Sequence, residues 1–139
     1  VEQFGGELIC TFSKRNRKPI STQLITGPSS SLTAWGNDFT FETYFERQVE
    51  ANGSKGDILI ILSTGGGNIK KRISTNLVYA AKMAKKKKLK IVSLVGKTGG
   101  YLYQNSDISI KINSNNTSVI QEAQMTILHS ICYYLEERL

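Results

Sequence analysis

The residues of this chain best placed to do chemistry are small polar residues directly behind an apolar run. Ser63, Thr64 and the glycines 65–67 follow residues 57–62 (DILIIL), which are typical of a strand buried on both faces. Open parallel sheets bind ligands beyond the carboxyl ends of their strands. Small residues let the backbone approach an oxyanion, and a following helix presents its positive end. The pattern predicts a phosphate-binding loop for a phosphorylated metabolite; a loop without a ligand is the alternative.

A carboxylate and the only histidine form a second candidate group. Glu7 lies between apolar residues of a predicted helix, one turn after Gln3. Partial desolvation would make it a candidate general base, and an ordinary surface charge is the alternative. His129 lies in another predicted helix, eight residues after Gln121. A lone helical histidine is often a core residue, but glutamine and histidine on an otherwise apolar helix favour a buried polar site.

The size and composition of the chain favour a single domain that spans residues 1–139, because 40% hydrophobic residues can build a core. No apolar run approaches the ~18 residues of a membrane span, and no signal-peptide pattern opens the chain. Cys10 and Cys132 have neither metal-type nor redox-type spacing. Both have apolar neighbours, which indicates buried free thiols and a reducing cytoplasm.

The net charge of +7 admits nucleic acid, anionic metabolites or no partner. Much of the excess comes from six lysines between residues 82 and 90, at the predicted end of a helix. Cations there complement the helix dipole. No aromatic residues interleave with these lysines, so a nucleic-acid partner is disfavoured.

Strands alternate with helices along the chain, which predicts an α/β fold with helices on both faces of a parallel sheet. The apolar runs predict strands at 20–26, 57–62, 90–95 and 107–112. Periodicity and capping predict helices at 1–12, 38–51, 74–87 and 117–139. The first predicted element is a helix without a capping signal, so we expect an N-terminal helix and strand to be missing.

Several segments resemble the sugar isomerase (SIS) domain family. Residues 57–64 (DILIILST), 92–100 (VSLVGKTGG) and 120–124 (IQEAQ), followed by Leu128 and His129, carry this resemblance. Within that superfamily the chain is most similar to phosphoheptose isomerases, through residues 4–8 (FGGEL) and 36–39 (GNDF) and the Gln-x7-His spacing. The resemblance implies a three-layer SIS domain with flavodoxin-like strand order, over nearly the whole chain.

The resemblance also implies site residues. Glu7 and His129 would shuttle protons, and Ser63, Thr64 and Ser74 would bind the substrate's phosphate. The full set of implied substrate-binding residues is Asp38, Ser63, Thr64, Gly65, Ser74 and Gln121. Many members of the family hold zinc, and the corresponding positions here are Gln3, Glu7, Gln121 and His129.

Two of these positions depart from the family's pattern. Gln3 stands where a histidine usually binds zinc, and a neutral amide is a poor zinc ligand, so we expect weak zinc binding or none. Gly65 replaces a serine of the phosphate loop. The glycine-rich loop that follows the family's first strand is also absent from the chain.

The resulting hypothesis is a cytoplasmic ketose–aldose isomerase of a seven-carbon sugar phosphate. Sedoheptulose 7-phosphate would become D-glycero-D-manno-heptose 7-phosphate through an enediol, for bacterial lipopolysaccharide or capsule synthesis. The resemblance implies a homotetramer with sites at subunit interfaces. The alternative is a non-catalytic SIS module that binds sugar phosphates as a regulator or binds a protein partner.

Overall fold

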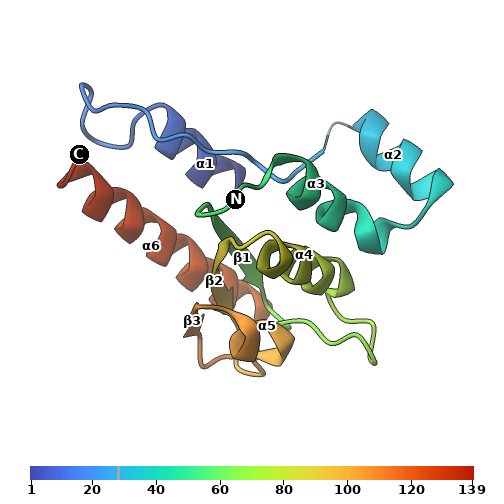
Figure 1. The fold of residues 1–139 in the computed structure, drawn as a ribbon. Coiled ribbons are helices and arrows are strands. Elements are labelled where there is room, and N and C mark those ends of the chain that lie inside the picture. The colour runs from blue at the N-terminus through green and yellow to red at the C-terminus, as the bar shows by residue number, and fades with distance from the viewer. Residues whose placement is uncertain (28) are drawn as a thin grey trace. The chain divides into compact units, whose positions relative to one another are not determined.

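The computed structural model describes residues 1–27 and 29–139 and divides the chain into two compact units. We call Ile25–Ile120 the sheet unit, and Val1–Leu24 with Gln121–Leu139 the helical unit. Figure 1 labels the helices and strands of both units. The prediction of one domain over 1–139 stays a prediction.

Three parallel strands form the centre of the sheet unit. β1 (Ile58–Ser63), β2 (Lys90–Val95) and β3 (Ile108–Lys111) lie in the order β1-β2-β3. Ser93 of β2 pairs with Ile61 on one side and with Ser109 on the other. The strands predicted at 57–62, 90–95 and 107–112 are therefore confirmed, and β3 is an edge strand as its alternating pattern indicated.

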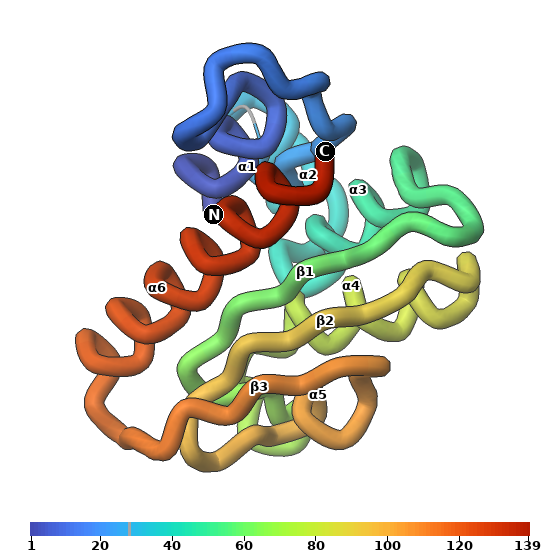
Figure 2. Tube along the Cα trace, turned by 90° about the vertical axis from the view of Figure 1, so that its left-hand side faces the viewer, coloured from blue at the N-terminus to red at the C-terminus, as the bar shows by residue number. Residues whose placement is uncertain are grey.

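Two helices connect these strands and cover one face of the sheet. α4 (Thr75–Lys86) links β1 to β2, and α5 (Gly100–Asn105) links β2 to β3. Two right-handed crossovers that advance in the same direction across a parallel sheet place their helices on the same face. Figure 2 shows α4 and α5 on one face of the sheet. α3 (Tyr44–Asn52) packs on α4. The core between these layers is apolar: Val49, Leu59, Ile61, Ala80, Ala81, Met83, Ala84, Leu89, Ile91, Val95 and Leu102.

The helix predicted at 38–51 begins later than expected. A separate helix, α2 (Ser29–Asp38), ends where that helix was to start, and a 3-10 turn, η1 (Phe41–Thr43), precedes α3. Thr40 causes the break, because its backbone is extended and its hydroxyl accepts the Glu42 N–H at 3.3 Å. α2 and α5 were not predicted, since one lacks a buried face and the other has only six residues.

The helical unit contains α1 (Glu2–Ile9) and most of α6 (Thr117–Glu136), as the sequence predicted. Two expectations for this part of the chain are wrong. Residues 20–26 form no strand in the described structure, since the sheet consists of β1, β2 and β3 and no strand pairs with this segment. Cys10 follows the last turn of α1 and is exposed, whereas Cys132 is buried as expected.

Two glycine turns of the sheet unit touch backbone to backbone. Gly66 has φ +69° and Gly100 has φ +56°, both in the left-handed region. A Cβ on Gly66 would lie 2.0 Å from the Gly99 carbonyl oxygen, and one on Gly100 would lie 2.5 Å from the Gly66 carbonyl carbon. The Gly66 carbonyl accepts the Leu102 N–H at 2.8 Å. Only glycine fits where the loop after β1 meets the start of α5.

Replacing Gly66 should therefore destabilise the protein, whereas a glycine in open space should tolerate the same change. We expect Gly66→Ala to cost about 2–4 kcal/mol of unfolding free energy, because the methyl group meets backbone and the residue keeps a positive φ. Gly36 of α2 is the matched control, since nothing lies within 4 Å of its added Cβ. Gly36→Ala should be stabilising by roughly 0.5 kcal/mol. Urea denaturation measures both, and equal stabilities of the two variants would contradict the close approach.

Candidate active site

The hydroxyl-rich loop lies where β1 ends, in the sheet unit. Ser63 is the last residue of β1 and is 6% exposed. Its Oγ donates to Ser74 Oγ at 3.2 Å and accepts the Gly66 N–H at 3.0 Å. Ser74 directly precedes α4 with φ +46° and makes no side-chain cap to that helix. The structure thus brings Ser63 and Ser74 together, as the phosphate-loop prediction requires.

The glycines of this loop do not all serve the role that the sequence suggested. Gly66 and Gly67 are buried, and their carbonyls accept the N–H groups of Leu102 and Tyr101. These two glycines therefore join the loop to α5, and the Gly66 N–H is already bonded to Ser63 Oγ. Thr64 and Gly65 remain partly exposed. Both can still face a ligand.

Thr75 is a polar residue of this loop that the sequence analysis did not place in the site. It is the first residue of α4 and is 6% exposed, and its Oγ1 has no hydrogen-bond partner among the described residues. Buried hydroxyls nearly always have a partner. The orphan hydroxyl sits at a helix N-terminus, where N–H groups and the dipole favour an anion. Its burial was the missing signal, because a threonine at the start of a predicted helix does not by itself indicate burial.

Asp38 lies at the C-terminal end of α2, also in the sheet unit, and is exposed. A carboxylate at that end of a helix is opposed by the dipole, so helix stability does not explain it. Next to it, Phe39 stacks on Trp35 with ring centroids 4.2 Å apart. Asp38 is thus free to contact a solute, and its predicted substrate role stays a prediction.

The candidate acid–base pair belongs to the helical unit. Glu7 of α1 and His129 of α6 approach each other, with Glu7 Oε1 3.5 Å from His129 Nε2. The Glu7 side chain is 15% exposed and the His129 side chain 33%. Phe12 stacks on the imidazole with centroids 5.4 Å apart. The two groups that the sequence singled out, remote in the chain, are therefore neighbours.

This contact is an ion-pair approach rather than a formed hydrogen bond. His129 Nε2 is buried and has no hydrogen-bond partner among the described residues. The imidazole nitrogen lies beside a carboxylate oxygen without a completed hydrogen bond, and both kinds of group can give or take a proton. The arrangement can therefore carry out general acid–base chemistry on a ligand.

The predicted zinc ligands are only partly brought together. Gln3 turns its amide nitrogen to Glu7 Oε1 at 3.2 Å, so the amide acts as a donor there. Gln121 is exposed and lies eight residues before His129, about 12 Å along the helix axis. Among the described residues no cluster of three or more His, Cys, Asp or Glu is placed to hold a metal ion. Two amides, one carboxylate and one imidazole suit zinc poorly, because its usual ligands are Cys, His and carboxylate.

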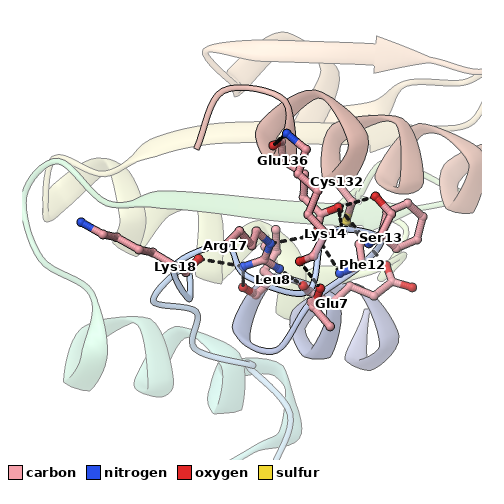
Figure 3. A network of polar contacts seen from close by, with 10 residues as sticks. Glu7, Leu8, Phe12, Ser13, Lys14, Arg17, Lys18, Cys132 and Glu136 are labelled. Atoms are coloured by element: carbon pink, nitrogen blue, oxygen red, sulfur yellow. Dashed lines mark hydrogen bonds and ion pairs between the residues drawn. The ribbon is translucent and has the colours of Figure 1, made fainter.

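A buried carboxylate holds the segment that follows α1 against the end of α6. Glu136 is 2% exposed, and its oxygens accept the backbone N–H groups of residues 12–14, the Ser13 hydroxyl and Arg17 Nε at 2.6–3.1 Å (Figure 3). Arg17 also donates to the carbonyls of Glu7 and Leu8. Arg17 thus ties the last turn of α1 to the last turn of α6, which keeps Glu7 beside His129.

The same network sets the protonation of Glu136. Burial alone would raise its pKa, but the Ser13 hydroxyl, the backbone N–H groups of residues 12 and 13 and Arg17 together hold the pKa of Glu136 well below its usual value. The carboxylate is therefore charged in the folded protein throughout the neutral range. Sequence reasoning missed both Glu136 and Arg17, because a charged residue near the end of an amphipathic helix gives no signal of burial.

Removing this charge should destabilise the protein. We expect Glu136→Gln to lower Tm by on the order of 5–10 °C, since it leaves the Arg17 guanidinium, 2% exposed, without its counter-ion. Glu50→Gln is the matched control, because Glu50 and Arg47 form an exposed pair that contributes little.

The difference between wild type and Glu136→Gln should depend on pH in one direction. A carboxylate with a lowered folded pKa stabilises fully above its unfolded pKa of about 4.3 and less as pH falls below that. Thermal melts from pH 7 down to pH 3 should therefore show the Tm gap closing only below about pH 4.3. A gap that stays constant over this range would mean that the charge of Glu136 is not what stabilises the unit.

No family model matches the chain. Individual proteins do match it. The chain is 35% identical to the phosphoheptose isomerase of Campylobacter concisus over 137 residues, which are 99% of this chain and 69% of that protein. It is 37% identical to the phosphoheptose isomerase of Aliarcobacter butzleri over 139 residues, covering 100% of the chain and 70% of the relative.

Solved structures give the same result. The fold matches a phosphoheptose isomerase from Francisella tularensis with a TM-score of 0.84 and 30% identity, over 94% of this chain and 66% of that one. It matches the phosphoheptose isomerase from Neisseria gonorrhoeae with a TM-score of 0.84 and 27% identity, over 98% and 68%. These likenesses confirm the SIS fold class that the sequence predicted. The chain belongs to the phosphoheptose isomerase family.

Proposed function

We propose that this protein interconverts sedoheptulose 7-phosphate and D-glycero-D-manno-heptose 7-phosphate. The observation that carries the proposal is the 3.5 Å approach of Glu7 to His129. Family membership supports the substrate class, because the relatives are named as phosphoheptose isomerases. A non-catalytic SIS module would not need this pair, so its presence favours the enzyme.

The chemistry of the pair fits an aldose–ketose isomerisation. The reaction moves a proton between two adjacent carbons through an enediol, so it needs a base near the carbon and an acid near the oxygens. We assign the carbon proton to the Glu7 carboxylate. We assign proton exchange with the substrate's oxygens to His129, whose Nε2 has no partner among the described residues.

We assign the substrate's phosphate to the loop after β1. Ser63 and Ser74 are already joined by a 3.2 Å hydrogen bond, and Thr75 adds a buried hydroxyl at the start of α4. The N-terminus of this helix favours a doubly charged anion. Thr64, Gly65 and Asp38 of the sheet unit remain proposed substrate contacts, as does Gln121 of the helical unit.

Substitution of the acid–base pair tests the proposal. Glu7→Gln and His129→Ala should each lower kcat by on the order of 10²–10⁴, because each removes one proton-transfer group. A coupled assay of sedoheptulose 7-phosphate isomerisation measures kcat, and thermal melts check folding. Glu46→Gln on α3 is a control outside the pair and should keep wild-type kcat. Full activity in either Glu7→Gln or His129→Ala would rule out the assigned roles.

We further propose that the reaction does not depend on zinc, because the Gln3 amide faces Glu7 as a donor. Activity should survive treatment with a chelator, and elemental analysis should find well under one zinc per chain. Gln3→His, which supplies an imidazole one turn before Glu7, should raise the zinc content. Stoichiometric zinc in the wild type, with loss of activity on chelation, would overturn this proposal.

We also propose a homotetramer in the cytoplasm, acting in bacterial lipopolysaccharide or capsule synthesis. Exposed aromatic residues on α6, Tyr133 and Tyr134 at 55% each, support an interface between copies of the chain. None of the helices in the described part of the chain is long and apolar enough to cross a membrane. Light scattering of the purified protein would give the number of chains.

A further inference from the structure

Cys132 contacts Glu7, the proposed base, at the carboxylate oxygen that does not face His129. Its Sγ lies 3.6 Å from Glu7 Oε2, and the thiol donates its proton to that oxygen (Figure 3). The other oxygen, Oε1, faces Gln3 Nε2 and His129 Nε2. The two oxygens of one carboxylate therefore have different partners, with a thiol on one and the amide and imidazole on the other.

The helix that carries the histidine also carries the thiol. His129 and Cys132 are three residues apart on α6, so they lie on the same face, one turn from each other. Cys132 is 1% exposed, so no water competes for its proton. A cysteine thiol is ordinarily protonated at neutral pH, so this side chain can act as the donor in the contact with Glu7.

We infer that Cys132 is a positioning residue, whose S–H group holds Glu7 Oε2 so that Oε1 stays directed to the imidazole and the substrate. This inference rests on the proposed function of Glu7 as the base. A carboxylate on a two-carbon stem rotates readily, and a small misplacement of a catalytic group can lower a rate a hundredfold. A fixed second oxygen restricts that rotation without neutralising the charge that accepts the proton.

Three substitutions separate positioning from packing. Cys132→Ala removes the donor and leaves space, Cys132→Val removes the donor and fills the space, and Cys132→Ser keeps a donor. We expect kcat to fall about tenfold in the first two, with KM within about twofold of wild type, since a hydrogen bond to a charged group is lost. Cys132→Ser should stay within about threefold of the wild-type kcat, whatever its Tm. Cys10→Ser is the control, because Cys10 is exposed, and should keep wild-type kcat.

The inference would be overturned if kcat of the three variants changed in parallel with their Tm, whether or not residue 132 has a hydrogen-bond donor. If the serine variant loses as much kcat as the alanine variant, or if the valine variant keeps full kcat, Cys132 only fills space. Either outcome leaves the proposed isomerase intact, provided that Glu7→Gln is still inactive.

A spectroscopic measurement tests the contact independently of activity. In a Cys10→Ser background the only remaining S–H group is that of Cys132. Its infrared stretching band should lie at low frequency, and Glu7→Gln should move it upward because a neutral amide oxygen is a weaker acceptor. An unchanged band would contradict the hydrogen bond. A shifted band in a protein that shows no isomerase activity would retain the contact and reject the proposed function.

Discussion

A buried carboxylate determines the geometry of the helical unit. Glu136 is charged and almost completely buried, so each lone pair must be satisfied by the protein. The segment after α1 supplies the donors from its backbone and from Ser13, and Arg17 supplies the countercharge (Figure 3). Because Arg17 also binds carbonyls at the end of α1, the contact between Glu7 and His129 depends on an ion pair that takes no part in the chemistry.

The geometry of the sheet unit depends on a different constraint, which is a direct contact between two backbone segments. The turn after β1 is held against the start of α5 at a distance that admits no Cβ on Gly66. This fixed turn leaves Ser63 bonded to Ser74 at the start of α4. Polar groups that bind an anion are most effective when their positions do not change on binding. The glycines therefore hold the hydroxyls of Ser63 and Ser74 in place.

The departures of this chain from its family's pattern are easier to interpret with the contacts in view. Gln3 does not simply replace a zinc ligand, because its amide donates to the Glu7 carboxylate. Gly65 lacks the hydroxyl of the family's serine, and Thr75 offers a buried hydroxyl at the start of α4. A carboxylate with amide, imidazole and thiol neighbours has the charge and the donors that proton transfer requires.

The sequence by itself determined the parallel strands, the long helices and the residue types of both reactive groups, because apolar periodicity and strand-end chemistry are local properties. Resemblance then paired Glu7 with His129. Only the tertiary structure showed the burial and the contacts of Glu136 and Cys132, since burial of a charge or a thiol depends on partners more than a hundred residues away. It also decided against a strand at 20–26. A strand exists only where a neighbour completes its hydrogen bonds, and a single segment cannot specify that neighbour.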